Sequence, residues 1–152
     1  MPATAHKSER TAIPASAIES KAEARAVTAR IVVLMAELRE TVQQETALVY
    51  SGRLITAGKV AGRKRELAAA FVANVARVRA SQAYFRRAAP DLLAALRTHH
   101  RKFRLGLRRD LARLATARAI AAGILRALAK KLGRCEILGA EPTEGVAERK
   151  AA

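Results

Sequence analysis

Apolar residues return every three or four positions along most of the chain, which is the spacing of an amphipathic α-helix. The first such stretch is predicted to begin at Ser16, because Ser16-Ala-Ile-Glu19 fits a capping box, and to end at Gly52, a residue type that often follows a helix. A helix over residues 16–51 would be about 54 Å long at about 1.5 Å per residue. One polar residue, Glu45, interrupts its apolar seam, which otherwise consists of Val27, Ile31, Leu34, Leu38, Val42 and Val49.

A second helix is predicted from Arg53 to about Ala88, with its apolar residues on one face. These inward positions are Leu54, Ile55, Ala61, Ala68, Phe71, Val75, Val78 and Phe85. Gly58 and Gly62 lie one turn apart, and without side chains they would let two backbones approach closely. Each also weakens the helix by roughly 1 kcal/mol, so a kink or a frayed turn is expected between Gly52 and Gly62.

A third helix is predicted from Pro90, which suits a first turn, to Gly133, with Asp91 near the positive end of the helix dipole. Its apolar positions are Leu93, Leu96, Phe103, Leu107, Leu111, Leu114, Ala121, Ile124 or Leu125, Leu128 and Leu132. Further apolar residues drift off this seam, at Leu105, Ala112, Ile120 and Ile124. The wide stripe fits either burial by two neighbouring helices or a partly uncovered groove that accepts an amphipathic helix from a partner.

The three patterns together predict an all-α fold, an elongated antiparallel three-helix bundle made of a long helical hairpin and a third long helix. Composition agrees with this prediction, because hydrophobic residues make up 51% of the chain and aromatic residues only 3%. The core must therefore be built from aliphatic and alanine side chains. Residues 16–133 are expected to form the bundle, and residues 1–15 and 134–152 are expected to be a disordered arm and a flexible tail.

The net charge of +16 changes the picture, because it is concentrated in the third predicted helix. From Arg97 to Arg134 there are twelve Lys or Arg residues and one acid, Asp110. Three interpretations stay open: a solvated outer face, a phosphate-binding surface, or a surface that docks on an acidic protein. The basic face consists of Arg101, Lys102, Arg104, Arg108 and Arg109. Nucleic acid is disfavoured because Phe103, the one aromatic residue of this window, occupies an inward position and offers no stacking platform.

No catalytic, metal-binding or cofactor-binding motif is recognisable, so the chain is not expected to be an enzyme. The segment AGKVAGRK at residues 57–64 resembles a phosphate-binding loop only superficially, since it lacks the first glycine and the final Lys-Ser/Thr pair. His99 and His100 are adjacent and cannot share one face of a helix, and Cys135 is the only cysteine. With no signal peptide and no apolar run near the ~20 residues that span a bilayer, a cytoplasmic location is expected.

A short pattern of residues marks the corner between the first two predicted helices. It consists of Glu45-Thr-Ala-Leu48, Gly52, Leu54, Lys64 and Glu66-Leu67. This pattern resembles the first corner of the FlgN-type flagellar export chaperones, and the chain length and long flanking helices also fit that family. Two features depart from it: the chain is basic where export chaperones are often acidic, and Arg118 stands near the place where the last helix often carries asparagine.

The resemblance implies a non-enzymatic, cytoplasmic chaperone of the flagellar type III export route that needs no cofactor. Such chaperones bind the C-terminal helical segments of hook–filament junction subunits, the hook-associated proteins. They keep these subunits from polymerising early and deliver them to the export apparatus. The partner-binding residues implied in this chain are Leu114, Ile120, Ile124 and Leu128. A small-molecule substrate is not expected, and a homodimer is left open.

Two other functions remain as alternatives. A basic helical protein associated with nucleic acid would use the basic face, and its binding would weaken steeply with salt. A coiled-coil stalk component of the export machinery would have two very long helices instead of three.

Overall fold

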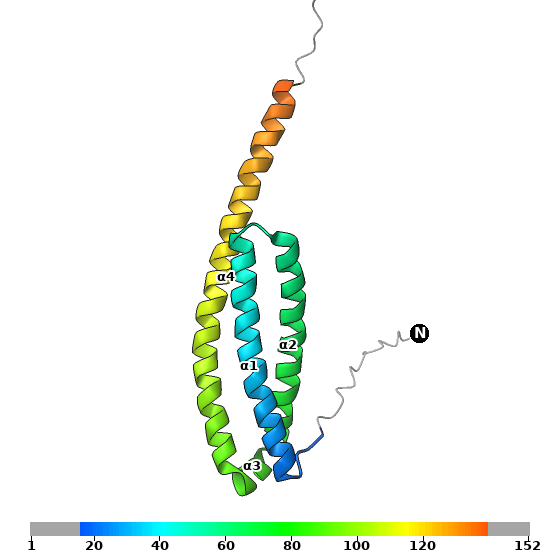
Figure 1. The fold of residues 1–152 in the computed structure, drawn as a ribbon, viewed down its shortest axis with the longest axis vertical. Helices are drawn as coiled ribbons and strands as arrows, with labels where there is room; N and C mark the ends of the chain where they lie inside the picture. Colours follow the sequence, from blue (N-terminus) through cyan, green and yellow to red (C-terminus); the bar gives the residue numbers. More distant parts are fainter. Residues whose placement is uncertain (1–15, 140–152) are drawn as a thin grey trace, which may run out of the picture.

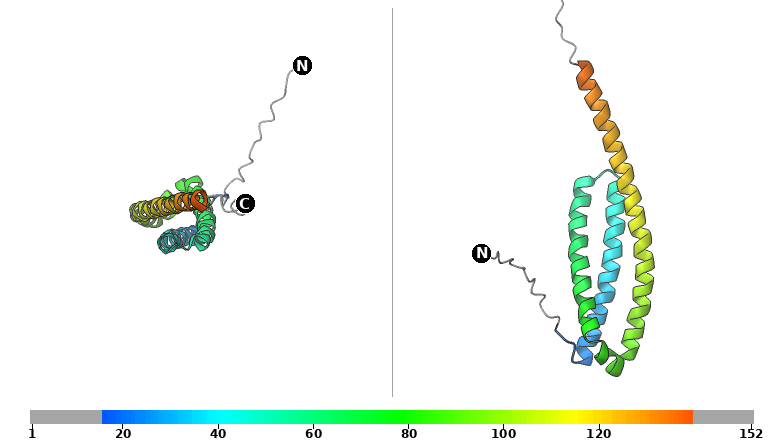
Figure 2. Two further views of the ribbon diagram at one scale, coloured as in Figure 1. Left: turned by 90° about the horizontal axis from the view of Figure 1, so that it is seen from above. Right: turned by 180° about the vertical axis from the view of Figure 1, so that it is seen from behind.

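The computed structural model describes residues 16–139, and within that range it is all-α (Figure 1). Four helices follow one another: α1 Lys21–Tyr50, α2 Leu54–Ala80, α3 Gln82–Ala88 and α4 Pro90–Gly139. α1 and α4 run in the same direction and α2 runs opposite to both, while the short α3 joins α2 to α4 (Figure 1, Figure 2). The all-α prediction is confirmed. The predicted arm at 1–15 and residues 140–152 of the predicted tail lie outside the described residues.

α1 is the helix that the other long helices share, because it packs lengthwise against both α2 and α4. α2 and α4 meet through longer side chains. The ring centroid of Phe71 on α2 lies 5.4 Å from that of Phe103 and 6.2 Å from that of His100, both on α4. Because α1 packs along its length against both α2 and α4, the arrangement of the three long helices depends mainly on two faces of α1.

α1 begins later than predicted, at Lys21, and the start at Ser16 is wrong. The residue that caps the helix is Ser20, whose hydroxyl accepts a hydrogen bond from the backbone amide of Glu23 at 3.2 Å. The carboxylate of Glu23 in turn accepts from the backbone amide of Glu19 at 3.0 Å. A reciprocal pair of capping bonds is present, four residues further along the chain than the sequence suggested.

The second predicted helix is divided in two at Ser81, which is buried at the junction of α2 and α3. Its hydroxyl accepts a hydrogen bond of 2.7 Å from the backbone amide of Ile18, whose side chain is buried in the core. This contact holds residues 16–20 against the end of α2, and it explains why α1 does not begin at Ser16. The break in the second helix falls here and not in the expected segment 52–62.

α1 ends at the predicted glycine. Gly52 has a φ of +73°, in the left-handed region that glycine adopts without strain. The amide of Arg53 donates to the carbonyl of Leu48 at 2.9 Å, and the amide of Gly52 donates to the carbonyl of Val49 at 3.1 Å. These two bonds form a Schellman motif, which satisfies carbonyls at the end of the helix and turns the chain into α2.

The other two glycines of this region do not bring helices into close contact. A Cβ atom placed on Gly58 or on Gly62 would meet nothing within 4 Å, so the predicted close approach and kink are wrong. Ala57 is the residue that the start of α2 buries. Leu54 and Ile55, which were expected to face inward, are exposed. α2 therefore leaves both apolar surface and open space at the α1–α2 corner.

α4 begins at Pro90 with Asp91 in its first turn, as predicted, but it continues through Gly133 to Gly139. A single glycine weakens a helix by only about 1 kcal/mol, and Gly133 does not end this one. Beyond the α1–α2 corner, α4 projects as a single helix (Figure 1, Figure 2). No helix within residues 16–139 is both long enough and apolar enough to cross a membrane.

Two apolar clusters fill the interior. The larger one lies toward α3 and includes Ile18, Ile31, Leu34, Phe85 and Phe103. The smaller one lies toward the α1–α2 corner and consists of Val42, Val49, Ala57, Leu114 and Ala117. Between these clusters along α4, the carboxylate of Asp110 is buried, and it accepts from Arg39 Nε at 2.8 Å and from Gln43 Nε2 at 3.2 Å. These polar contacts tie α4 to α1 at one position along the helices.

Candidate functional site

The apolar seam of α4 continues past the point where the other helices cover it. Leu114 and Ala117 are buried, and they pack with Val42 and Val49 of α1. α1 ends at Tyr50, and between Ile120 and Leu132 of α4 the large apolar side chains are between 49% and 66% exposed. We call these residues the α4 stripe: Ile120, Ile124, Leu125, Leu128 and Leu132. Exposed apolar surface that is contiguous in this way is typical of protein interaction sites.

The structure divides the four residues that the resemblance assigned to partner binding. Ile120, Ile124 and Leu128 are exposed members of the α4 stripe. Leu114 is only 2% exposed, and it belongs to the core cluster between α1 and α4. Leu114 is therefore corrected to a core residue, because α1 occupies the surface that a partner would need.

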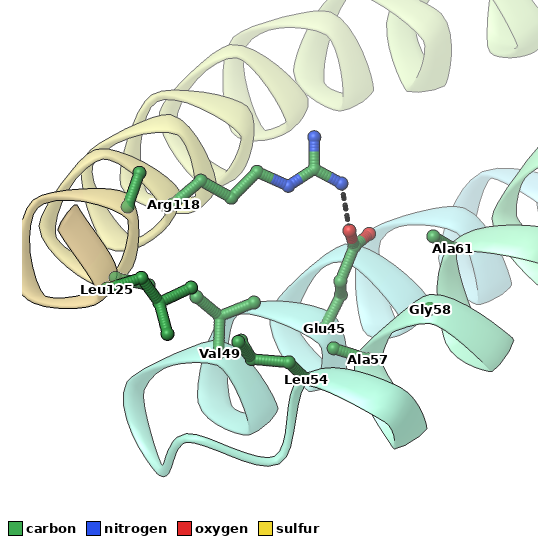
Figure 3. A pocket seen from close by; sticks show the side chains of 10 residues that line it. Glu45, Val49, Leu54, Ala57, Gly58, Ala61, Arg118 and Leu125 are labelled. Carbon is green, nitrogen blue, oxygen red and sulfur yellow. Dashed lines mark hydrogen bonds and ion pairs between the residues drawn. The ribbon is translucent and has the colours of Figure 1, made fainter. Parts of the chain in front are cut away.

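A hollow of about 310 Å³ lies at the α1–α2 corner, at the foot of the α4 stripe (Figure 3). Its walls come from α1, α2 and α4, and we call it the corner hollow. The lining residues are Glu45, Val49, Leu54, Ala57, Gly58, Ala61, Arg118, Ala121, Ala122 and Leu125. Half of them are alanine or glycine, so the space exists because these positions carry almost no side chain.

Glu45 is the charged residue at one end of the corner hollow, and it is only 1% exposed. Its carboxylate accepts from Lys64 Nζ of α2 at 2.6 Å. It also accepts from the guanidinium of Arg118 of α4 (Figure 3). A buried carboxylate is costly unless cations and hydrogen bonds compensate its lost hydration. The network therefore joins all three long helices at the corner.

The sequence marked Glu45 as the one polar member of an apolar seam, but it did not identify the partners. Lys64 is 19 residues away and Arg118 is 73 residues away. Both contacts depend on how far each helix extends before the chain turns. The sequence around Glu45 carries no information on those helix lengths. The small side chains that form the hollow, such as Ala57 and Ala121, were also missed as a site, since alanine is common throughout the chain.

All five residues of the predicted basic face are exposed, but they do not share one face of α4. Arg101, Arg104 and Arg108 line a second hollow, of about 570 Å³, together with Arg97, His100 and Leu105. Lys102 and Arg109 are displaced from this row by about 100° around the helix axis, at 3.6 residues per turn. The structure thus gathers four arginines into one row, and this row includes Arg97, which the sequence prediction left out.

The remaining candidate chemistry is limited. Within residues 16–139, no group of three or more His, Cys, Asp or Glu side chains is arranged to hold a metal ion. The ring of His100 stacks on that of Phe71, with an interplanar angle of 11°. The described part of the chain thus offers three surface features: an apolar stripe, a hollow lined mostly by small residues, and a row of arginines.

Comparison of the chain with protein-family models, with curated proteins and with solved structures gives no match. The function therefore has to be inferred from the geometry of the stripe, the hollow and the arginine row.

Proposed function

We propose that this chain is a chaperone that binds an amphipathic helix of another protein along the projecting part of α4. The observation that carries the proposal is the α4 stripe, which extends a buried seam into solvent. A helix with apolar residues at matching three- and four-residue spacing would cover this stripe. It would pack against the projecting part of α4 in the way that α1 packs against the buried part of the same seam. Binding of the unassembled partner would then lower the concentration of the free form that is able to polymerise.

The sequence resemblance suggests which partner to test. In the FlgN-type export chaperones, the bound segments are the C-terminal helices of hook–filament junction subunits, which are then delivered to the type III export apparatus. Three residues that carry the resemblance have structural roles at the α1–α2 corner: Glu45 and Lys64 form the ion pair, and Gly52 makes the turn. Leu67 is buried further along α2, in the larger core cluster. The corner pattern thus positions the base of the α4 projection, and this supports a chaperone of this type as the working hypothesis.

The direct test is binding of the purified chain to the C-terminal segment of a hook-associated protein, measured by isothermal titration calorimetry. We expect one bound segment with a dissociation constant in the micromolar range or below. Replacing Leu128 and Leu132 with serine should weaken binding at least tenfold for each leucine that the partner buries, because burying one leucine contributes about 1.5–3 kcal/mol.

The matched control for this test is Val72→Ser on α2, which removes an equally exposed apolar side chain far from the stripe. Its affinity should equal that of the unmodified chain. Absence of binding at micromolar concentrations of every junction segment would refute the assignment to this class of chaperone.

The row of arginines favours one second candidate, a protein that binds nucleic acid through phosphate contacts. Arg97, Arg101, Arg104 and Arg108 are exposed and lie along one side of α4. Binding through these residues would weaken steeply as salt is raised, since each neutralised phosphate releases counterions. A gel-shift assay at low salt tests this, and a chain with all four arginines changed to glutamine is the control. No shift at low salt would exclude this candidate.

The stalk alternative is less compatible with the observed helices. A stalk component was expected to have two very long helices, whereas the described chain has three long helices and the short α3. Its helices also pack as a group around α1, with only the end of α4 projecting.

A further inference from the structure

The corner hollow and the α4 stripe meet at Leu125, which belongs to both. Leu54 and Gly58 are also exposed at the edge of the hollow, so it is accessible from the side on which α4 projects. A helix that lies on the stripe and extends toward the bundle would pass over this opening. The hollow is therefore positioned to receive one side chain of the bound helix.

We propose that the corner hollow is the anchor site for a large aliphatic side chain of an acidic amphipathic helix. This inference rests on the proposed function, and it adds the chemistry of the partner. Apart from Glu45 and Arg118, every residue that lines the hollow is apolar or glycine. A volume of about 310 Å³ lies at the lower end of the ~300–1,000 Å³ range of ligand sites, which suits a side chain better than a free cofactor.

The charges around the hollow select an acidic partner. Glu45 is buried and paired, so it presents little negative charge to a docking helix. Arg118 is half exposed, and one of its five N–H donors is directed to Glu45. Its remaining N–H groups can donate to a carboxylate of the docking helix. From residue 113 to residue 134, α4 carries six exposed cations and no acid. They are Arg113, Arg118, Arg126, Lys130, Lys131 and Arg134. At 3.6 residues per turn, Arg113, Arg118 and Lys131 lie on the side of α4 that carries the stripe, whereas Arg126, Lys130 and Arg134 lie on the far side.

The same charges argue against a second copy of this chain as the occupant. A second copy would bring its own Arg113, Arg118 and Lys131 to the stripe and would add a further net charge of +16. Like charges placed opposite one another without acidic partners repel. An acidic helix instead pairs its flanking carboxylates with these cations while its apolar face covers the stripe.

The test uses the full 152-residue chain and two designed 20-residue helical peptides. Both peptides carry leucine at i, i+3, i+4 and i+7, and the flanking positions are glutamate in one and lysine in the other. The variant Gly58→Leu fills the hollow, and because a Cβ atom there meets nothing within 4 Å, the backbone of α2 accommodates it. Gly62→Leu is the matched control, since it makes the same change one turn away with equally open space, outside the hollow.

We expect Gly58→Leu to weaken binding of the acidic peptide at least tenfold and Gly62→Leu to change it less than twofold. The lysine peptide should bind at least tenfold more weakly than the acidic one. Circular dichroism confirms that each variant keeps its helices. If Gly58→Leu loses them, Ala122→Leu fills the hollow from the opposite wall and takes its place.

Each outcome decides a different point. If the acidic peptide and the junction segments all fail to bind the unmodified chain, the proposed function itself is refuted. If the acidic peptide binds but Gly58→Leu, or Ala122→Leu in its place, retains full affinity, the α4 stripe stands and the anchor site in the hollow is refuted. If the lysine peptide binds as tightly as the acidic one, the inference of an acidic partner is wrong.

Discussion

Glu45 shows what one polar residue in an apolar seam can do for the arrangement of helices. Its position in α1 requires two cations to reach it, Lys64 from α2 and Arg118 from α4. Lys64 is mostly buried and Arg118 is half exposed, so they contribute differently. Removing one partner of a buried pair is much more destabilising than replacing both partners with apolar side chains, because the remaining charge keeps its desolvation penalty.

The first prediction compares these two kinds of change. Lys64→Met alone should lower the free energy of unfolding by about 1–3 kcal/mol, since the carboxylate of Glu45 keeps only Arg118. The double change of Glu45→Leu with Lys64→Met should recover most of this loss, because two apolar side chains then fill the same space. Urea unfolding followed by circular dichroism measures both values.

The control for this prediction is Lys59→Met, which changes an exposed lysine of the same helix. Its effect should stay within about 0.5 kcal/mol, as expected of a surface substitution. If Lys64→Met were equally harmless, Arg118 alone would offset the lost hydration of the Glu45 carboxylate. The ion pair between Lys64 and Glu45 would then contribute no stability.

At the scale of helices, the ends that depend on local chemistry could be predicted. Gly52 ends α1 through its left-handed φ, and Pro90 begins α4, because both effects lie within the residue itself. Ser16 and Ser20 each precede a glutamate by three residues, so the sequence alone offers two equivalent starts for α1. The burial of Ile18 decides between them, and that is a tertiary contact.

The break between α2 and α3 was missed for the same reason. Ser81 has no proline or glycine beside it, and nothing in its local sequence distinguishes it from a helical serine. Its role becomes visible only when its hydroxyl accepts the amide of Ile18, 63 residues away. Local signals thus predicted the helix ends at Gly52 and Pro90, and the long-range hydrogen bond between Ile18 and Ser81 accounts for the wrong start of α1 and the missed break after α2.

The second prediction concerns the contact that ties α4 to α1. A Cβ atom on Gly106 would lie 2.5 Å from Cζ of Arg39, so Gly106→Ala must displace the guanidinium that donates to Asp110. Alanine favours the helix by about 1 kcal/mol, whereas a hydrogen bond to a buried charge contributes about 1.5–3 kcal/mol. The net result should be a loss of about 1 kcal/mol.

A double-mutant cycle with Arg39→Ala isolates this effect. In the Arg39→Ala background no guanidinium stands in the way, so Gly106→Ala should stabilise the protein by about 1 kcal/mol. A change of sign between the two backgrounds, measured by urea unfolding of all four proteins, would support the contact. If Gly106→Ala stabilises both backgrounds, Arg39 keeps its bond to Asp110 from another rotamer, and Gly106 has no special role.

At the scale of the whole molecule, the sequence predicted the class and direction of the helices better than their extents. Period and composition indicated three long helices with aliphatic cores, and the helices are present. The length of α4 relative to α1 and α2 was not predictable, because Gly133 suggested an end. The apolar seam also gave no sign of the point beyond which α1 and α2 no longer bury it. That difference in extent is what exposes Leu128 and buries Leu114, two residues with the same spacing in the pattern.

The last prediction separates the folded body from the projecting part of α4. A chain that ends after Gly123 loses Ile124, Leu125, Leu128 and Leu132, each of them more than half exposed. It keeps Leu114 and the rest of the smaller apolar cluster, with Val42, Val49, Ala57 and Ala117, so the stability of the three-helix body should hardly change. Because about 1 kcal/mol corresponds to only a few degrees in a domain of this size, the melting temperature should shift by less than about 5 °C.

The shortened chain should at the same time lose its affinity for the acidic peptide, since most of the α4 stripe is gone. The unmodified chain and the chain with Leu128 and Leu132 changed to serine serve as references in the same melting and titration experiments. If the shortened chain no longer unfolds cooperatively, the projection contributes to the core, and its exposed leucines are not a separate docking surface. If it melts normally and binds nothing, folding and binding reside in different parts of one helix, because α1 stops at Tyr50 and α4 does not.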